Sequence, residues 1–264
     1  MKGLINFESI WRRSLKGLGL YNQWLLYREK HFPNKQMQGM RKVYSQFVTP
    51  GALCFDIGAN MGSRIASLLM LGAKVVAVEP QEQCLVELRK LYSNKPVTII
   101  AKGVGATEGI KKFFVSSNPL VSSFSEEWIE GMSKKLTKDR WDKTVQMEIT
   151  TLDLLIKDYG KPDFIKIDTE GFELEVLNGL TQTVKSLSFE YTIPEPGNKT
   201  ILCIDRINTL YANKAVFNIC RDELYEMKFA EWITGPALKK LIESPEFNTE
   251  NFGNYGDIYV KLAN

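Results

Sequence analysis

Histidine, cysteine and long apolar runs are scarce in this 264-residue sequence. His31 is the single histidine, and the four cysteines are too widely spaced for a CxxC pair or a zinc-binding pattern. We therefore expect no histidine base, no structural zinc site and no disulfide framework, and a reducing, cytoplasmic location. No apolar run approaches the ~20 residues of a membrane span, and residues 1–17 lack the pattern of a secretory leader.

Apolar side chains are plentiful, and charge is unevenly distributed. Hydrophobic residues make up 44% of the chain and charged residues 25%, a composition that excludes disorder as the main state. Residues 1–50 carry nine Lys or Arg against two Glu, whereas the remainder carries 25 basic and 29 acidic residues. We predict that residues 1–48 form a helical extension, with one helix near 36–47. It could cover a site, pair two subunits or contact anionic lipid, or it could simply present a solvated basic face.

From residue 49 to residue 264 the pattern indicates one α/β domain. Short apolar strands alternate with amphipathic helices, which favours parallel strands joined by crossovers and covered by helices on both faces. The prediction is a Rossmann-like, mostly parallel sheet of seven strands, plus an inserted hairpin with strands at 111–117 and 144–152. The seven strands are expected at 53–58, 74–80, 97–104, 163–168, 186–193, 215–221 and 256–262.

The motif FDIGANMG at 55–62 indicates a nucleotide-type cofactor. A strand, a glycine turn and a helix follow one another, with Asp56 at the strand tip and Gly58 and Gly62 allowing close approach of the backbone. Neither the GxGxxG nor the Gly-Lys-Ser/Thr pattern is present, so the sequence favours a cofactor that needs no phosphate-binding loop. Glu79 ends the next strand, where a carboxylate can accept hydrogen bonds from both ribose hydroxyls. Together these features favour S-adenosylmethionine over NAD.

A second group of charged residues lies in FIKIDTEGFELEVLNG. Lys166 and Asp168 share one face of a strand, and a lysine in such an apolar strand needs a carboxylate partner. We expect them to converge with Glu170, Glu173 and, from the next strand tip, Glu190. Asp168 is the candidate base, with Glu170 and Lys166 as further catalytic candidates. Asp168, Glu170 and Glu190 could alternatively bind Mg²⁺. The plainer reading is a set of acids favoured by a helix N-terminus and a structural ion pair.

The polar stretch 116–141 within the hairpin is the candidate acceptor side. Ser122, Ser123 and Trp128 offer hydroxyls and an aromatic face that suit a sugar or planar acceptor, and Glu190 would face the same acceptor. A plain surface hairpin is the alternative.

Three motifs, FDIGANMG, VVAVEP and FIKIDTEGFELEVLNGL, resemble those of the FkbM-type methyltransferases, a class I S-adenosylmethionine-dependent family. The resemblance covers residues 45–262. It implies a seven-stranded sheet with the last strand antiparallel, and O-methylation of hydroxyls on sugars, polyketides and related small molecules. The loop AKGVGATEG departs from the pattern, because it lacks the acid often found near the adenine. The implied cofactor-binding residues are Asp56, Gly58, Asn60 and Gly62 at the methionine end, Glu79 and Pro80 at the ribose, Gly103 and Val104 beside the adenine, and Asp168.

The leading interpretation is therefore an O-methyltransferase acting on a small molecule or glycan. The tip sequence IDTEG disfavours N-methylation, and a nucleic-acid partner is unlikely because no aromatic-basic module is present. Methylation of a protein acceptor and binding of S-adenosylmethionine without turnover remain open as alternatives. A homodimer and a peripheral membrane contact through the basic residues 1–48 also remain open.

Overall fold

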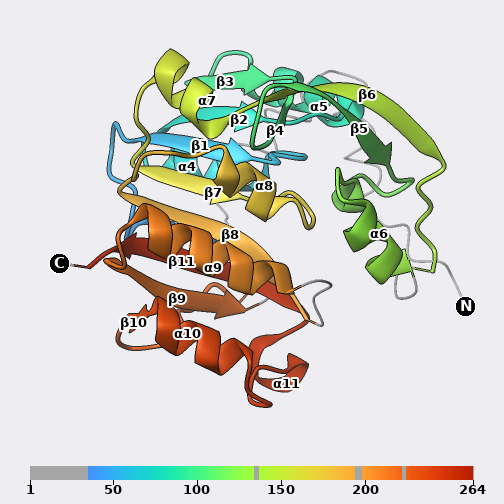
Figure 1. The fold of residues 1–264 in the computed structure, drawn as a ribbon. Coiled ribbons are helices and arrows are strands. Elements are labelled where there is room, and N and C mark those ends of the chain that lie inside the picture. Colours follow the sequence, from blue (N-terminus) through green and yellow to red (C-terminus); the bar gives the residue numbers. More distant parts are fainter. Residues whose placement is uncertain (1–34, 134–136, 194–197, 222–223, 264) are drawn as a thin grey trace, which may run out of the picture.

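The computed structural model describes residues 35–133, 137–193, 198–221 and 224–263, and the helices predicted within residues 1–34 lie outside them. The strands of its main sheet are β1 (Leu53–Ile57), β2 (Lys74–Val78), β3 (Val97–Ile100), β7 (Phe164–Ile167), β8 (Ser186–Thr192), β9 (Ala215–Arg221), β10 (Ile233–Thr234) and β11 (Tyr255–Leu262). Their order is β10-β9-β11-β8-β7-β1-β2-β3 (Figure 1).

The sheet is parallel in one half and antiparallel in the other. Strands β3, β2, β1, β7 and β8 pair in parallel, whereas β11 lies antiparallel between β8 and β9. The predicted seven-stranded, mostly parallel sheet with an antiparallel last strand is confirmed, and the two-residue β10 adds an eighth strand at the edge.

Helices cover both faces, as predicted, and each face has its own apolar core. The helices are α3 (Lys35–Tyr44), α4 (Ser63–Met70), α5 (Glu82–Tyr92), α6 (Glu126–Ser133), α7 (Leu152–Tyr159), α8 (Glu173–Asn178), α9 (Lys199–Leu210), α10 (Gly235–Ile242) and α11 (Thr249–Phe252). Side chains of α7, α8, α9 and α10 pack on one face, and those of α3, α4 and α5 on the other (Figure 1). Buried side chains recur at helical spacing, such as Ile65 and Leu68 on α4, which explains why these segments bury one face.

The described part of the predicted extension, residues 35–48, packs into the core of the domain. After α3, the Phe47 ring stacks on Phe164 and on Tyr259, with ring centroids 5.4 Å apart in both pairs. The rings join three segments distant in sequence, so a boundary at residue 48 does not separate α3 from the sheet. The helix predicted at 36–47 is present, ending three residues earlier.

The inserted hairpin forms a second, three-stranded sheet with the order β4-β6-β5. Its strands are β4 (Gly103–Val104), β5 (Gly109–Val115) and β6 (Lys143–Thr150). The strand predicted to run from 97 to 104 is therefore divided, because the backbone leaves the main sheet after Ile100 and pairs with β6 instead. A 3-10 turn, η1 (Pro119–Val121), and α6 lie between β5 and β6.

The four cysteines are buried, as their apolar neighbours predicted. Within the described ranges, no helix has the length and apolarity required to cross a bilayer.

Candidate functional site

A cavity of about 440 Å³ opens at the carboxyl ends of β1, β2, β7 and β8, with the hairpin insertion along one side. Parallel α/β sheets place ligands at this edge. Asp56, Gly62, Ser123 and Lys166, also predicted for the site, do not line it. The predicted residues that line the cavity are Gly58, Asn60, Glu79, Pro80, Gly103, Val104, Ser122, Trp128, Asp168, Glu170 and Glu190.

Two glycines shape the turn after β1 in different ways. Gly58 has φ +83°, and a Cβ there would overlap the carbonyl oxygen of Asp168, so only glycine lets these two strand ends approach. Gly62 has φ +80°, and its carbonyl accepts a hydrogen bond from the Tyr92 hydroxyl at 2.8 Å. Gly62 therefore packs the turn against α5, and direct contact with a cofactor stays a prediction.

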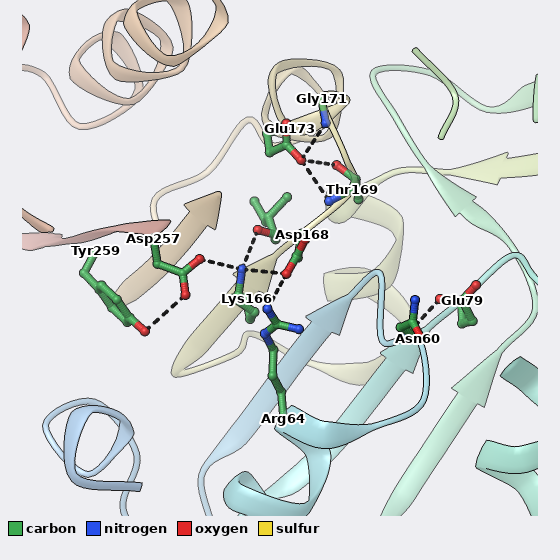
Figure 2. Close-up of polar contacts among 11 residues, drawn as sticks. Asn60, Arg64, Glu79, Lys166, Asp168, Thr169, Gly171, Glu173, Asp257 and Tyr259 are labelled. Atoms are coloured by element: carbon green, nitrogen blue, oxygen red, sulfur yellow. Dashed lines mark hydrogen bonds and ion pairs between the residues drawn. The ribbon is translucent and has the colours of Figure 1, made fainter. Parts of the chain in front are cut away.

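Glu79 is held at the cavity by two backbone groups. Its Oε2 accepts from the Asn60 N–H and its Oε1 from the Gln81 N–H, both at 2.8 Å (Figure 2 draws the Asn60 contact). A carboxylate has about four acceptor positions, so each oxygen keeps one for a further donor. Burial raises the pKa of Glu79 to about 7, although the two backbone hydrogen bonds oppose this shift. The arrangement suits the ribose-binding role predicted for Glu79.

Asp168 lies between two cations. Its carboxylate forms ion pairs with Arg64 and, at 3.4 Å, with Lys166 (Figure 2). Burial alone would raise the pKa of Asp168, but the two positive charges, together with a hydrogen bond from Glu190, lower it to about 2. Asp168 thus stays ionised at neutral pH and is a weak base.

Lys166 is fully buried and does not line the cavity. Its Nζ donates to Asp257 Oδ1 at 2.8 Å and to the Ile167 carbonyl at 3.1 Å, and Tyr259 donates to the other Asp257 oxygen at 3.5 Å (Figure 2). Burial alone would lower the pKa of Lys166, but Asp168 and Asp257 raise it. Lys166 is therefore a charged anchor for two carboxylates. Its placement favours a structural role over the predicted catalytic one.

Asp56 does not line the cavity either. Its side chain is fully buried on the strand next to Lys166, and neither carboxylate oxygen has a hydrogen-bond partner among the described residues. Burial raises the pKa of Asp56 to about 6, against the attraction of Arg64 and Lys166. The predicted contact of Asp56 with the methionine end of a cofactor would therefore require movement, and it stays a prediction.

Asp168, Glu170 and Glu190 form the carboxylate cluster, as predicted. One oxygen from each residue lies within 4.8 Å of the others. Burial and the negative charge of Asp168 raise the pKa values of both Glu170 and Glu190 well above the usual range. The cluster can therefore hold protons near neutral pH, and its oxygens could also bind a hard divalent cation.

Glu173 supports the cluster from outside the cavity. Its Oε1 accepts from the Thr169 N–H at 2.8 Å, the Thr169 hydroxyl at 3.0 Å and the Gly171 N–H at 3.3 Å (Figure 2). These bonds fix a turn in which Glu170 and Gly171 have φ values of +53° and +83°. The predicted convergence of Glu173 with the cluster is thus indirect, because the side chain caps the turn that carries Glu170.

The insertion reaches the cavity through the predicted residues. Trp128 is buried and packs so closely on Gly171 that a Cβ there would overlap its ring. Ser123 Oγ donates to the Glu170 carbonyl at 2.6 Å, which fastens the insertion to the turn. The Ser122 hydroxyl donates to Gln81 Oε1 at 2.9 Å, so its partner is a side chain of the β2 loop.

Sequence reasoning missed Arg64 and Gln81, which both line the cavity. Arg64 lies in the first turn of α4, two residues after the glycine turn. A cation at this position could have predicted an ion pair with one of the carboxylates at the ends of the neighbouring strands. Gln81 follows VVAVEP, and a polar residue at that position gave no signal of its own.

Comparison with known proteins connects this geometry to one family. A family model described as "Methyltransferase FkbM domain" matches residues 56–232. The hexuronic acid methyltransferase AglP of Haloferax volcanii is 28% identical over 135 residues, or 51% of this chain and 52% of that protein. The chain thus aligns with about half the length of that curated relative.

Solved structures with a similar fold are more distant. A precorrin-6y C5,15-methyltransferase from Geobacter metallireducens has 11% identity and a TM-score of 0.44, covering 85% of this chain and 88% of that one. SMU.1697c from Streptococcus mutans, in complex with SAH (S-adenosylhomocysteine), has 13% identity and a TM-score of 0.41, covering 84% and 95%.

Proposed function

Since this chain belongs to the FkbM methyltransferase domain family, we propose that it is an S-adenosylmethionine-dependent O-methyltransferase acting on a hydroxyl of a small molecule or glycan. The observation that carries the proposal is one cavity with two chemically different ends. Glu79 offers two acceptor oxygens at one end, and the carboxylate cluster offers proton-holding groups at the other.

The cofactor end fits S-adenosylmethionine. The two outer acceptor positions of Glu79 match a vicinal ribose diol. Gly58 and Gly103 line the cavity, and its volume lies within the ~300–1,000 Å³ range of small-molecule sites. When bound, S-adenosylmethionine supplies a sulfonium methyl group for transfer.

The cluster is proposed to accept the proton of the acceptor hydroxyl. Glu190 and Glu170 are favoured for this step over the Asp168 that the sequence suggested, because Asp168 is neutralised by Arg64 and Lys166. A carboxylate with a raised pKa is the stronger base once it is ionised, so either glutamate in its ionised form would take the proton more readily than Asp168, whose pKa is lowered. Asp168 then holds the two cations and orders the strand tip.

The cavity charge supports a neutral or carbohydrate acceptor. Among the described lining residues the cations are Arg64, which pairs with Asp168, and Lys102, which pairs with Glu148, so this lining offers no unpaired cation to a polyanion such as nucleic acid. The name of the Haloferax volcanii relative supports a sugar-type acceptor.

The direct test is transfer of labelled methyl from S-adenosylmethionine to a panel of hexuronic acids, neutral sugars and phenols. We expect the full chain to methylate at least one acceptor. Glu190→Gln should lower transfer by about 10²-fold or more while changing the Kd of SAH by less than about threefold. Glu130→Gln, a matched change at an exposed site on α6, should leave both methyl transfer and the Kd of SAH unchanged. Unchanged transfer by Glu190→Gln would remove it from catalysis, and SAH binding without any transfer would favour a binding module.

A divalent cation is a second way for the cluster to activate a hydroxyl. The closeness of the three carboxylates favours it, whereas the engagement of Asp168 by two cations weighs against it. We expect transfer to survive exhaustive EDTA dialysis. A loss of about tenfold or more that Mg²⁺ restores would contradict a metal-free mechanism and assign the cluster to the metal.

A further inference from the structure

The segment 116–124, here called the wall segment, forms one side of the cavity. Its members Asn118 to Ser122 and Phe124 line it. The base of the segment is closed by two backbone hydrogen bonds between Phe114 and Ser123, at 2.9 and 3.1 Å. The Ser122 hydroxyl also accepts from the Ser116 N–H at 2.9 Å. The wall segment is therefore a small loop that is closed at its base by hydrogen bonds.

Two side-chain amides attach this loop to the cofactor end. Asn60 Nδ2 and Gln81 Nε2 both donate to the Pro119 carbonyl, at 3.1 and 2.9 Å. The same two residues donate their backbone N–H groups to the two oxygens of Glu79. Each residue thus holds the ribose-binding carboxylate with its main chain and the wall segment with its side chain. Ser122 fixes the Gln81 amide by donating to its oxygen.

The opposite end of the wall segment is attached to the carboxylate cluster. Ser123 Oγ donates to the Glu170 carbonyl at 2.6 Å, next to Gly171, on which Trp128 packs. The loop therefore spans the distance between the two functional ends of the cavity through side-chain contacts on both sides.

We infer that Asn60 and Gln81 are positioning residues that couple the ribose site at Glu79 to the wall segment. A ligand that draws Glu79 into a fixed position also fixes the two backbone N–H groups, and through their side chains the Pro119 carbonyl. Cofactor binding then sets the wall against which the acceptor lies, and by linkage each ligand favours the binding of the other. This inference rests on the proposed function, because it assumes that Glu79 takes the ribose.

The test compares hydrogen–deuterium exchange of residues 116–124 with and without SAH. The variant is Asn60→Gly with Gln81→Met, which removes both amide donors but leaves the backbone N–H groups and the net charge unchanged. Glycine suits position 60 because Asn60 has φ +47°. Gln146→Met, at an exposed site on β6, is the matched control. Ser122→Ala is a milder second variant: it keeps the Gln81 amide but removes the hydroxyl that donates to it and that accepts from the Ser116 N–H.

In the wild type and in Gln146→Met, SAH should slow exchange in the wall segment by about tenfold or more. In the double variant SAH should still protect the glycine turn, but the wall segment should exchange at its ligand-free rate. The dissociation rate of SAH should rise by about tenfold with an unchanged association rate. Ser122→Ala should show a partial effect. Equal protection of the wall segment in the variants would overturn the inference while leaving the function standing. Failure of the wild type to bind SAH would instead overturn the proposed function.

Discussion

Glu79→Ala is expected to weaken SAH binding by more than about 100-fold. The ionised carboxylate can accept two hydrogen bonds from the ribose, and hydrogen bonds to charged groups contribute about 1.5–3 kcal/mol each. The substitution also leaves the buried N–H groups of Asn60 and Gln81 without their acceptor. Calorimetric titration measures the loss. Glu82→Ala, three residues later and exposed on α5, should bind normally, and an affinity of Glu79→Ala within tenfold of the wild type would place the ribose elsewhere.

The same carboxylate predicts a pH dependence of binding. The pKa of Glu79 is raised to about 7 in the folded protein by burial, so its protonated form is favoured on folding. The stabilisation that comes from the protonated Glu79 carboxyl is complete at a pH below the usual pKa of glutamate. It is lost as the pH rises through 7. Ligand binding has the opposite dependence, because only the ionised form accepts from both hydroxyls. SAH affinity should therefore fall about tenfold between pH 8 and pH 6. Glu79→Gln should lack this dependence.

Lys166→Ala is expected to lower the free energy of unfolding by about 3–5 kcal/mol. Removing one partner of a buried charge network leaves the others uncompensated. Here Asp257 loses a 2.8 Å contact and Asp168 loses one of its two cations. Denaturant unfolding measures the change.

The matched control for this effect is Lys185→Ala. Lys185 is largely exposed, and its contact with Asp163 is 3.7 Å long, so its removal should cost less than about 1 kcal/mol. Adding Asp257→Asn to Lys166→Ala should restore part of the lost free energy of unfolding, since the Asp257 carboxylate that Lys166 no longer neutralises is then absent. A cost for Lys166→Ala similar to that of Lys185→Ala would show that the network does not stabilise the fold.

Parallel topology made much of the fold and the site predictable. Residues that directly follow apolar strands meet at one edge of a parallel sheet. Glu79, Asp168 and Glu190 could therefore be assigned to one place from their positions in the sequence, and the fold brings them to one cavity. The inserted hairpin and the antiparallel last strand were also predicted correctly.

Features that depend on loop conformation could not be predicted in this way. The pairing of Arg64 with Asp168 depends on the direction of α4. The shared acceptor of Asn60 and Gln81, the Pro119 carbonyl, lies in a loop 59 and 38 residues further along the chain, respectively. Glu173 was grouped with the cluster because spacing gives the face of a turn but not its hydrogen bonds.

The most direct test of the central claim is calorimetric titration of the purified full chain with SAH, with NAD as the control ligand. The account predicts one SAH per chain with a Kd in the micromolar range and no binding of NAD, because the glycine turn lacks the pattern of a phosphate-binding loop. Binding of NAD with no binding of SAH would contradict the assignment of the cavity to S-adenosylmethionine, and with it the methyltransferase mechanism.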